Sequence, residues 1–274
     1  MERPPFHKWS FPDGSIWAHF YSADDYYLIR FPGLADFEIS RGTLAVACFA
    51  VPGVSDGTVE HLFLNQVLPL VLSKQGKLVF HASAIETPAG VIAFMGASGR
   101  GKSTLAASFA GTGLRFLTDD ALLIEEMSDG RYLVHPSHAS IRLWDDSQRA
   151  LVGDGVCLAP PVQYTSKARL LSGDALRHCA EARPLSRVYF LGDGAAVDVT
   201  FKEMKPSEAM IALVKNTFLL DIDAQQTLAA HFEQLSKMVA LPIYYQLDYP
   251  RRFDDLPSLR TAIVEHALQD PSGI

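Results

Sequence analysis

Several features that would place the 274-residue chain in a special class of protein are scarce in its sequence. Its 3 cysteines, Cys48, Cys157 and Cys179, are widely spaced and odd in number, which argues against a disulfide framework and against a zinc knuckle. The longest apolar runs, residues 44–51 and 67–72, are much shorter than the roughly 20 residues of a membrane span. The N-terminal stretch MERPPFHKWSFPDGS has no apolar core of a signal peptide. We therefore expect a soluble, cytoplasmic protein.

An excess of positive charge is also missing. The 24 Lys and Arg residues face 31 Asp and Glu residues, which gives a net charge of −7. This balance argues against a nucleic-acid partner and against binding to an anionic membrane, and the basic pair Arg251–Arg252 is too short to change it. No internal repeat or low-complexity segment is present. With 48% hydrophobic and 20% charged residues, the chain has the composition of an ordinary globular protein.

The first 75 residues differ in predicted secondary structure from the rest of the chain. Residues 16–21, 26–31, 37–40 and 43–51 predict short strands, because apolar and aromatic residues alternate between Asp, Gly and Pro turns. Residues 61–75 predict a helix, in which Pro69 can introduce a kink. We expect a small β-rich N-terminal subdomain with a linking helix over residues 1–75, and a larger domain over residues 76–274.

The larger part predicts an α/β fold, a mixed sheet flanked by helices. We expect strands at 78–86, 90–96, 114–120, 131–136, 139–146 and 243–249, and helices at 102–111, 206–219, 224–239 and 256–268. Residues 186–193 and 196–201 predict a hairpin around the turn from Gly192 to Ala195. Residues 147–183 are polar and mixed, and no element is assigned to them.

One motif carries most of the chemical information. The stretch GASGRGKST, residues 96–104, fits the phosphate-binding pattern G-x-x-x-x-G-K-[ST], and it lies between a predicted strand and a predicted helix, as that pattern requires. Glycines allow the backbone N–H groups to surround a phosphate chain; Lys102 reaches the terminal phosphates, and Ser103 offers its hydroxyl to Mg²⁺. The expected nucleotide-binding residues are Gly96, Ala97, Ser98, Gly99, Arg100, Gly101, Lys102, Ser103 and Thr104.

A phosphoryl-transfer site also needs carboxylates close to the phosphates. Asp119 and Asp120 end the next predicted strand; if this strand runs parallel to the loop strand, the aspartates lie at the same edge of the sheet as the loop. We expect them to hold Mg²⁺ or to accept a proton. His81 could reach them if its strand lies beside the loop strand, although a lone histidine in an apolar strand is more often a core residue.

In this order, the segments FHAS (80–83), GASGRGKST and TDD (118–120) resemble the catalytic domain of HPr kinase/phosphorylase. The resemblance covers roughly residues 76–270, with its specific motifs in 80–146. It implies a P-loop serine kinase related in fold to phosphoenolpyruvate carboxykinase, using ATP and Mg²⁺, with a possible homo-oligomer. It also implies that Lys102 and Ser103 bind phosphate and Mg²⁺, that Asp120 is the proton acceptor, and that His81 is the active-site histidine.

The chain departs from that family after the aspartate pair. A Gly-rich segment with a metal-binding glutamate is replaced by SIRLWDDS (140–147), so we expect Asp145 or Asp146 to replace that ligand, with a polar strand-end turn as the alternative. Arg142 either points into the site or is exposed. The β-rich front and the segment IRLWDD look more like the HPr-kinase-like proteins of lasso-peptide biosynthesis, which implies a C-terminal serine of a precursor peptide as acceptor.

Other functions remain open at this point. An HPr-type carrier protein or a small hydroxylated metabolite could be the acceptor. The loop alone also fits an ABC-type ATPase, although only LLSGDAL (170–176) approaches the signature helix of that class. A non-catalytic ATP-binding regulator would keep the loop and need no proton acceptor. We expect an ATP-dependent kinase in which Asp120, His81 and Lys102 are catalytic and Ser103, Asp119, Asp120 and Asp145 are the candidate metal ligands.

Overall fold

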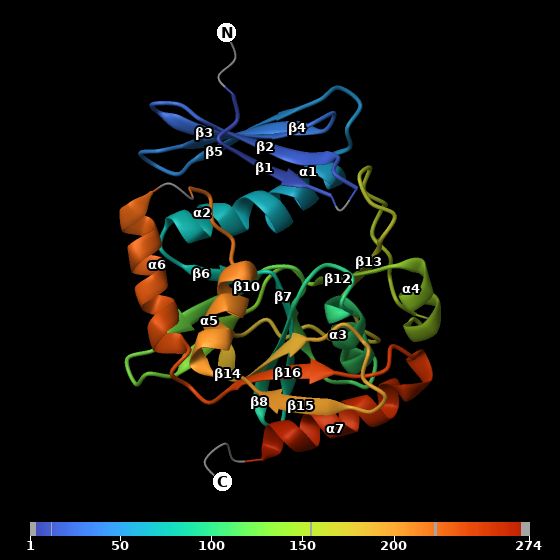
Figure 1. Cartoon of the computed structure of the whole chain (residues 1–274). Helices are drawn as coiled ribbons and strands as arrows, with labels where there is room; N and C mark the ends of the chain where they lie inside the picture. The colour runs from blue at the N-terminus through green and yellow to red at the C-terminus, as the bar shows by residue number, and fades with distance from the viewer. Residues whose placement is uncertain (1–3, 12, 154, 222–223, 270–274) are drawn as a thin grey trace. The chain divides into compact units, whose positions relative to one another are not determined.

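The computed structural model of the chain describes residues 4–11, 13–153, 155–221 and 224–269. It is a mixed α/β structure (Figure 1) and splits into two compact units. Unit 1 comprises Met1–Val71 and Pro161–Thr165, and unit 2 comprises Leu72–Pro160 and Ser166–Ile274. The division lies within the helix that was expected to link the two parts. No sequence signal pointed to the short excursion of residues 161–165 into unit 1.

Unit 1 contains a five-stranded antiparallel sheet whose strands follow one another in chain order. The strands are β1 (His7–Ser10), β2 (Ile16–Ser22), β3 (Tyr26–Phe31), β4 (Ala35–Ser40) and β5 (Val46–Ala50). Four of them coincide with predicted strands, and β1 was not predicted. Along β4, the buried Ala35, Phe37 and Ile39 alternate with more exposed residues, as expected for a sheet with one buried face.

The helical segment of unit 1 begins earlier than predicted. It comprises α1 (Asp56–Leu62), the π-helical turn η1 (Phe63–Val67) and α2 (Leu68–Lys74), which continues into unit 2. The π-helical turn ends two residues before Pro69, which has no N–H for a helical hydrogen bond. Gln163 of the 161–165 segment accepts a hydrogen bond from Ser55 N–H at 2.9 Å and donates its own N–H to Thr58 Oγ1 at 3.1 Å, so this segment contacts the start of α1.

Unit 2 contains a nine-stranded mixed sheet and a separate two-stranded sheet. The large sheet has the order β6-β10-β11-β14-β8-β7-β9, and β16 joins β14 to β15. Its strands are β6 (Leu78–Phe80), β7 (Ala82–Thr87), β8 (Gly90–Met95), β9 (Phe116–Thr118), β10 (Leu122–Glu126), β11 (Tyr132–His135), β14 (Arg183–Leu191), β15 (Thr200–Glu203) and β16 (Tyr244–Asp248). The small sheet pairs β12 (Ser140–Leu143) with β13 (Ala168–Leu171).

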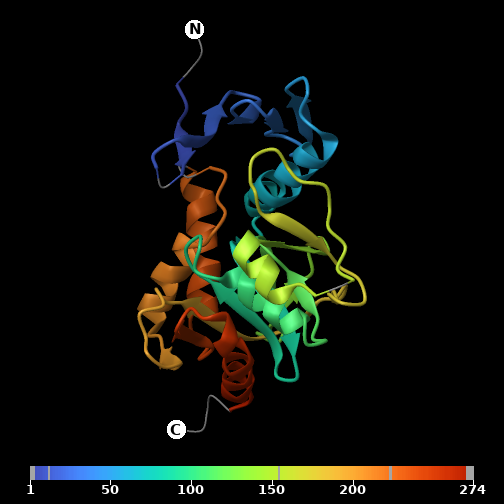
Figure 2. The same cartoon turned by 90° about the vertical axis from the view of Figure 1, so that its right-hand side faces the viewer.

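Helices cover both faces of the large sheet (Figure 1). They are α3 (Lys102–Ala110), α4 (Asp145–Leu151), α5 (Pro206–Lys215), α6 (Gln225–Met238) and α7 (Leu256–Leu268), with a 3₁₀ turn (Phe253–Asp255) before α7. Strand β8 is buried on both sides: Val91, Ala93 and Met95 pack in the core with α5 and α6, whereas Ile92 and Phe94 pack with α3 and α7. Figure 2 shows α4 beside α3, and the two helices contact each other.

Three predictions for unit 2 are corrected. The expected strand 78–86 breaks at His81 into β6 and β7, which pair with different strands. The expected hairpin of 186–193 with 196–201 does not form, because β16 lies between β14 and β15 and pairs with both. The expected strand 139–146 ends at Leu143, and its two aspartates begin α4 instead, where negative charge is favourable next to the helix N-terminus.

Among the described residues, no helix combines the length and the apolar character that crossing a membrane would require.

Candidate active site

The phosphate-binding loop connects the end of β8 to the start of α3. Its backbone has φ values of +141° at Gly96, +80° at Gly99 and +89° at Gly101, a region that glycine adopts most readily. At Gly101 a Cβ atom would also lie 3.0 Å from Nη1 of Arg251. Glycines at these positions therefore allow the turn that brings the loop N–H groups and the start of α3 together, which is the arrangement that binds phosphate in other proteins.

Lys102 is buried at the start of α3, and its Nζ donates to the carbonyl oxygens of Gly96 at 2.7 Å and of Ala97 at 3.2 Å. Burial lowers the pKa of its ammonium group to about 8, and the charge of Lys167 contributes in the same direction. The negative charges of Asp120 and Asp119 oppose this shift. The lysine is thus held across its own loop, close to two carboxylates.

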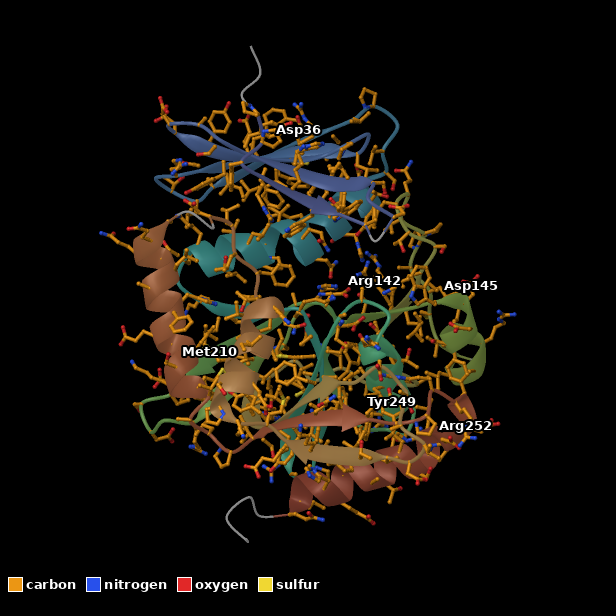
Figure 3. The ribbon with its side chains drawn as sticks, in the orientation of Figure 1. Asp36, Arg142, Asp145, Met210, Tyr249 and Arg252 are labelled. Carbon is orange, nitrogen blue, oxygen red and sulfur yellow. The ribbon has the colours of Figure 1, made fainter. Side chains whose placement is uncertain are left out.

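The residues after Lys102 connect the loop to α4. Thr104 Oγ1 lies 3.1 Å from the hydroxyl oxygen of Ser147, and the partly buried Ser103 faces the cavity described below. Asp146 lines the same cavity, and its Oδ1 accepts a hydrogen bond from Ser147 N–H at 2.6 Å. Asp145 is exposed on α4 (Figure 3) and does not line the cavity. Of the two aspartates considered as replacements for the missing metal ligand, only Asp146 therefore lines the cavity.

Asp119 and Asp120 are both buried, but they have different surroundings. The carboxylate of Asp119 accepts a hydrogen bond from Ser83 Oγ at 2.5 Å and another from the backbone N–H of Arg142 at 2.9 Å. Asp120 has a left-handed backbone, with φ at +76°, and its Oδ2 accepts from Nε of Arg142 at 2.7 Å and lies 2.5 Å from Nη2. Only Asp120 lines the cavity, so the pair is divided between an internal and a cavity-facing carboxylate.

The two carboxyl groups also differ in acidity. Burial raises the pKa of Asp119, and the neighbouring charge of Asp120 raises it further. Burial alone would raise the pKa of Asp120 as well, but the positive charges of Arg142 and Lys167 and the hydrogen bond from Arg142 act together against this effect, and the pKa lies well below its usual range. Asp120 is therefore ionised at neutral pH. Arg142 lines the cavity, so of the two orientations considered from the sequence it has the one that points into the site.

His81 lies in the bend between β6 and β7, and its Nδ1 is 3.0 Å from the backbone carbonyl oxygen of Asp120. Because a carbonyl can only accept, Nδ1 carries the proton. Burial, with the nearby charge of Lys102, lowers the pKa of His81 to about 4, so the ring is neutral at physiological pH. His81 thus contacts the Asp120 backbone and not its carboxylate.

Asn216, the residue after α5, joins the histidine to the loop. Its backbone carbonyl accepts from the N–H of His81 at 2.7 Å, and its side-chain Oδ1 accepts from the N–H of Gly96 at 3.2 Å. A single residue therefore fixes the backbone on both sides of the site. Its position in a polar helix end gave no sequence signal.

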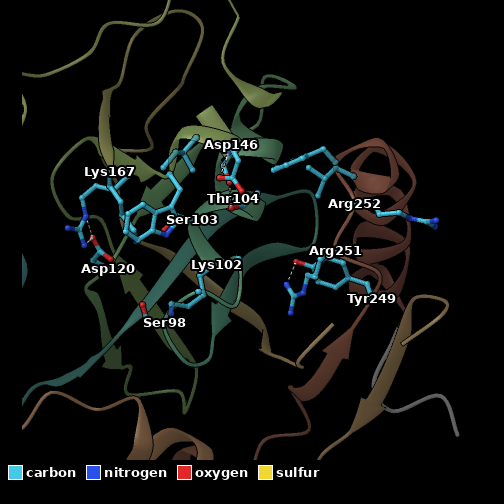
Figure 4. A pocket seen from close by; sticks show the side chains of 18 of the residues that line it. Ser98, Lys102, Ser103, Thr104, Asp120, Asp146, Lys167, Tyr249, Arg251 and Arg252 are labelled. Atoms are coloured by element: carbon cyan, nitrogen blue, oxygen red, sulfur yellow. Dashed lines mark hydrogen bonds and ion pairs between the residues drawn. The ribbon is translucent and has the colours of Figure 1, made fainter. Parts of the chain in front are cut away.

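These groups meet at a cavity of about 240 Å³ (Figure 4). Of the predicted residues, it is lined by His81, Ser98, Gly99, Gly101, Lys102, Ser103, Thr104, Asp120 and Asp146. Gly96, Ala97, Arg100, Asp119 and Asp145 do not line it. Figure 4 shows Asp120 and Lys167 on one side of Lys102 and Ser103, and Tyr249, Arg251 and Arg252 on the other. The cavity is smaller than most small-molecule sites.

Several lining residues were missed. Lys167 comes from the segment that was left unassigned, and its Nζ lies 5.1 Å from the ring centroid of Trp144. Arg251 had been considered only as part of a basic pair. Its guanidinium lies 4.3 Å from the ring centroid of Tyr249 and donates to the carbonyl oxygens of Arg100 and, at 2.9 Å, of Gly192. It thereby connects the phosphate-binding loop to the segments after β14 and β16.

The donor groups suit Mg²⁺ only in part. No group of three or more His, Cys, Asp or Glu side chains that could hold a metal is found in the described part of the chain. The cavity offers the hydroxyl of Ser103 and the carboxylates of Asp120 and Asp146. This small set of oxygens fits a Mg²⁺ ion that takes its other ligands from substrate phosphates and water.

No family model and no curated protein sequence matches the chain. Among solved structures, the chain is similar to the Hpr(Ser) kinase/phosphatase from Coxiella burnetii, with a TM-score of 0.34 and 10% sequence identity. The similarity covers 69% of this chain and 96% of the other. A TM-score of this size is too low to support an argument about fold or activity.

Proposed function

We propose that the chain is an ATP-dependent kinase that transfers a phosphoryl group to a serine hydroxyl of a peptide or protein. One observation carries this proposal. The phosphate-loop residues Lys102 and Ser103 line the same cavity as an ionised carboxylate, Asp120, which a phosphate-binding loop alone does not require. A regulator that only binds ATP needs no carboxylate to orient an acceptor hydroxyl.

The phosphate-binding part follows from the loop geometry. The β- and γ-phosphates of ATP would accept hydrogen bonds from N–H groups of residues 97–103, at the N-terminus of α3. Lys102 would exchange its bonds to the Gly96 and Ala97 carbonyls for bonds to phosphate oxygens. Ser103 and one of the carboxylates in the cavity would hold Mg²⁺, which, when bound, neutralises charge on the phosphates.

The acceptor part depends on Asp120. Its low pKa keeps it ionised, so it can accept a hydrogen bond from the substrate hydroxyl and orient that hydroxyl toward the γ-phosphate. Phosphoryl transfer is largely a matter of positioning and electrostatics, so a weakly basic carboxylate that receives the proton late is sufficient. In the same proposal, Arg142 stabilises the ionised form, His81 supports the Asp120 backbone, and Asp119 anchors the turn.

The acceptor serine is proposed to lie near the C-terminus of a lasso precursor peptide. This part rests only on the resemblance of the segment 140–147 and of the β-rich front to kinases of that kind. An HPr-type carrier protein is the second acceptor to test.

The test is transfer from radiolabelled ATP, with Mg²⁺, to synthetic peptides that end in a serine-containing segment and to an HPr-type protein. Lys102→Ala and Asp120→Asn are expected to lose transfer while their circular dichroism spectra stay unchanged. Lys202→Ala, which removes an exposed lysine on β15, is the matched control and should retain it. Transfer that survives in Asp120→Asn would refute the proposed role of that residue, and transfer that survives in Lys102→Ala would refute the kinase proposal.

A further inference from the structure

The free edge of strand β5 in unit 1 is not explained by the proposed chemistry. β5 pairs with β4 on one side, and no described strand pairs with it on the other. Residues 47–50 are exposed, and Phe49 is 56% exposed. The stretch AVACFAV, residues 45–51, contains no charged residue and no proline. Proteins usually protect an edge strand with such residues, so the bare edge of β5 favours pairing with another extended chain.

The hydrogen-bond register shows which backbone groups are available at this edge. Ser40 N–H donates to the carbonyl of Ala45, and Val51 N–H donates to the carbonyl of Leu34, each at 2.9 Å. In an antiparallel pair such bonded positions alternate, so the N–H and C=O groups of residues 46, 48 and 50 point away from β4. An added strand could bond to these groups without disturbing the existing sheet.

A groove of about 500 Å³ lies beside this edge. Phe37, Val46 and Cys48 of the sheet line one side of it, and Asp56, Val59, Glu60 and Phe63 of the helical segment line the other. The spacing of these four helical residues places them on one face of the helix. A strand added to β5 would direct every second side chain into this groove.

The groove has a definite chemical character. Val59 and Phe63 offer apolar surface, whereas Asp56 and Glu60 offer carboxylates. Neither carboxylate has an ion-pair partner among the described residues of the chain. An occupant that complements both features carries an apolar side chain and a basic side chain at alternate positions of one strand.

We propose that β5 and this groove bind an extended peptide with alternating apolar side chains and a lysine or arginine, by adding a strand to the unit 1 sheet. This goes beyond phosphoryl transfer. The same peptide would also carry the acceptor serine if the proposed function is right, and only this part of the proposal rests on that function. A second copy of the chain fits less well, because its β5 segment, AVACFAV, has no basic residue to face Asp56 and Glu60.

Fluorescence anisotropy without ATP tests the proposal. The probe is a fluorescein-labelled peptide that alternates threonine with valine and has an arginine in place of one valine. We expect it to bind, and a matched peptide with glutamate in place of arginine to bind at least about fivefold more weakly. The double variant Asp56→Asn/Glu60→Gln keeps the side-chain volumes and should lose this preference between the two peptides.

Val46→Pro tests the strand edge itself. It removes an N–H group that points away from β4, so the β4–β5 hydrogen bonds remain, and we expect binding to weaken at least about tenfold. The proposal is overturned if the arginine peptide does not bind, if both peptides bind equally, or if Val46→Pro binds as tightly as the wild type. A dimer in sedimentation equilibrium that Val46→Pro dissociates would assign the edge to a second copy instead.

Lys102→Ala separates this proposal from the proposed function. The variant leaves unit 1 unchanged, so it should bind the arginine peptide normally even though it transfers no phosphate. Normal peptide binding together with surviving transfer would contradict the kinase proposal alone. If the groove acts as described, Asp56→Asn/Glu60→Gln loses the preference for the arginine peptide and Val46→Pro binds it more weakly, while ATP binding is unchanged in both variants.

Discussion

ATP binding is expected to weaken as the pH rises above 8, because the lysine of the phosphate-binding loop loses its charge there. Burial lowers the pKa of Lys102 to about 8 from an ordinary value of 10.5. The phosphate chain interacts with the charged form, so above pH 8 the free protein must take up a proton when ATP binds. This coupling follows from the burial of Lys102, whose effect on the pKa exceeds the opposing effect of the two nearby carboxylates.

The size of the effect can be worked out from that pKa. At pH 9 about one molecule in eleven keeps a charged Lys102 without ligand, so the apparent Kd for ATP should be about tenfold higher than at pH 7. The stability of the free protein should change in the opposite sense. Between about pH 8 and 10.5 the unfolded chain holds a proton that the folded chain has released, so folding becomes more favourable as the pH rises.

Isothermal titration calorimetry from pH 7 to pH 9, in buffers with different ionisation enthalpies, measures both the Kd and the uptake of protons. Lys102→Met is the control, because it retains much of the side-chain volume but cannot titrate, and its weaker binding should not depend on pH in this range. A wild-type Kd that stays constant between pH 7 and 9 would refute the reasoning. The same pH dependence in Lys102→Met would assign the titration to another group.

Three further predictions test the rest of the site. Arg142→Met should lower the free energy of unfolding in urea by about 3–5 kcal/mol, because it leaves the buried carboxylate of Asp120 without its ion pair, and adding Asp120→Asn should restore most of the loss. A loss well below 1 kcal/mol would show that the pair is not buried as described. Asn216→Leu removes one hydrogen bond to Gly96 but keeps the backbone bond to His81, so the Kd for ATP should rise about fivefold with the fold intact; an unchanged Kd would contradict this role. Asp119→Asn should retain transfer, since an amide can accept from Arg142 N–H and donate to a reoriented Ser83 hydroxyl, whereas Asp120→Asn should reduce kcat by about 10²–10⁴-fold; equal losses would show that both carboxylates act in transfer.

The order of the elements could be read from the sequence wherever the pattern is local. Periodicity, glycines and prolines indicated the α/β class, the loop between β8 and α3 and the last helix. The loop and the helix lie close to their predicted positions. Pairing between distant strands could not be read in this way. Gly192 suggested a hairpin, but a Cβ atom there would lie 2.5 Å from Cγ of Asp248, so this glycine allows close contact with the end of β16 instead.

The site was predictable in its motif residues and not in the residues that support them. The spacing from Lys102 to the aspartates indicated correctly that the two segments approach each other, but β9 pairs with β7 and not with β8. Lys167, Arg251 and Asn216 come from segments without a motif, and they reach the loop only through the tertiary fold. Nothing in the sequence alone distinguishes these residues from ordinary exposed polar positions.

The small sheet of β12 and β13 explains why the two aspartates can differ so much while being adjacent. Arg142 on β12 bonds to Asp119 through its backbone N–H and to Asp120 through its guanidinium, so the placement of one strand fixes both carboxylates. The left-handed backbone at Asp120 allows its side chain to turn toward the cavity, and Asp adopts this conformation more readily than most residues.

The residue just before β13, Lys167, is a second cation that lines the cavity, besides Arg142. Leu143 pairs with Ala168, so the next positions bring Trp144 and Lys167 together across the small sheet, in agreement with their cation–π contact. Lys167 also lies close in the chain to the segment 161–165, which packs within unit 1 against Ser55 and Thr58 at the start of α1. Only one residue, Ser166, separates that segment from a cation in the proposed active site.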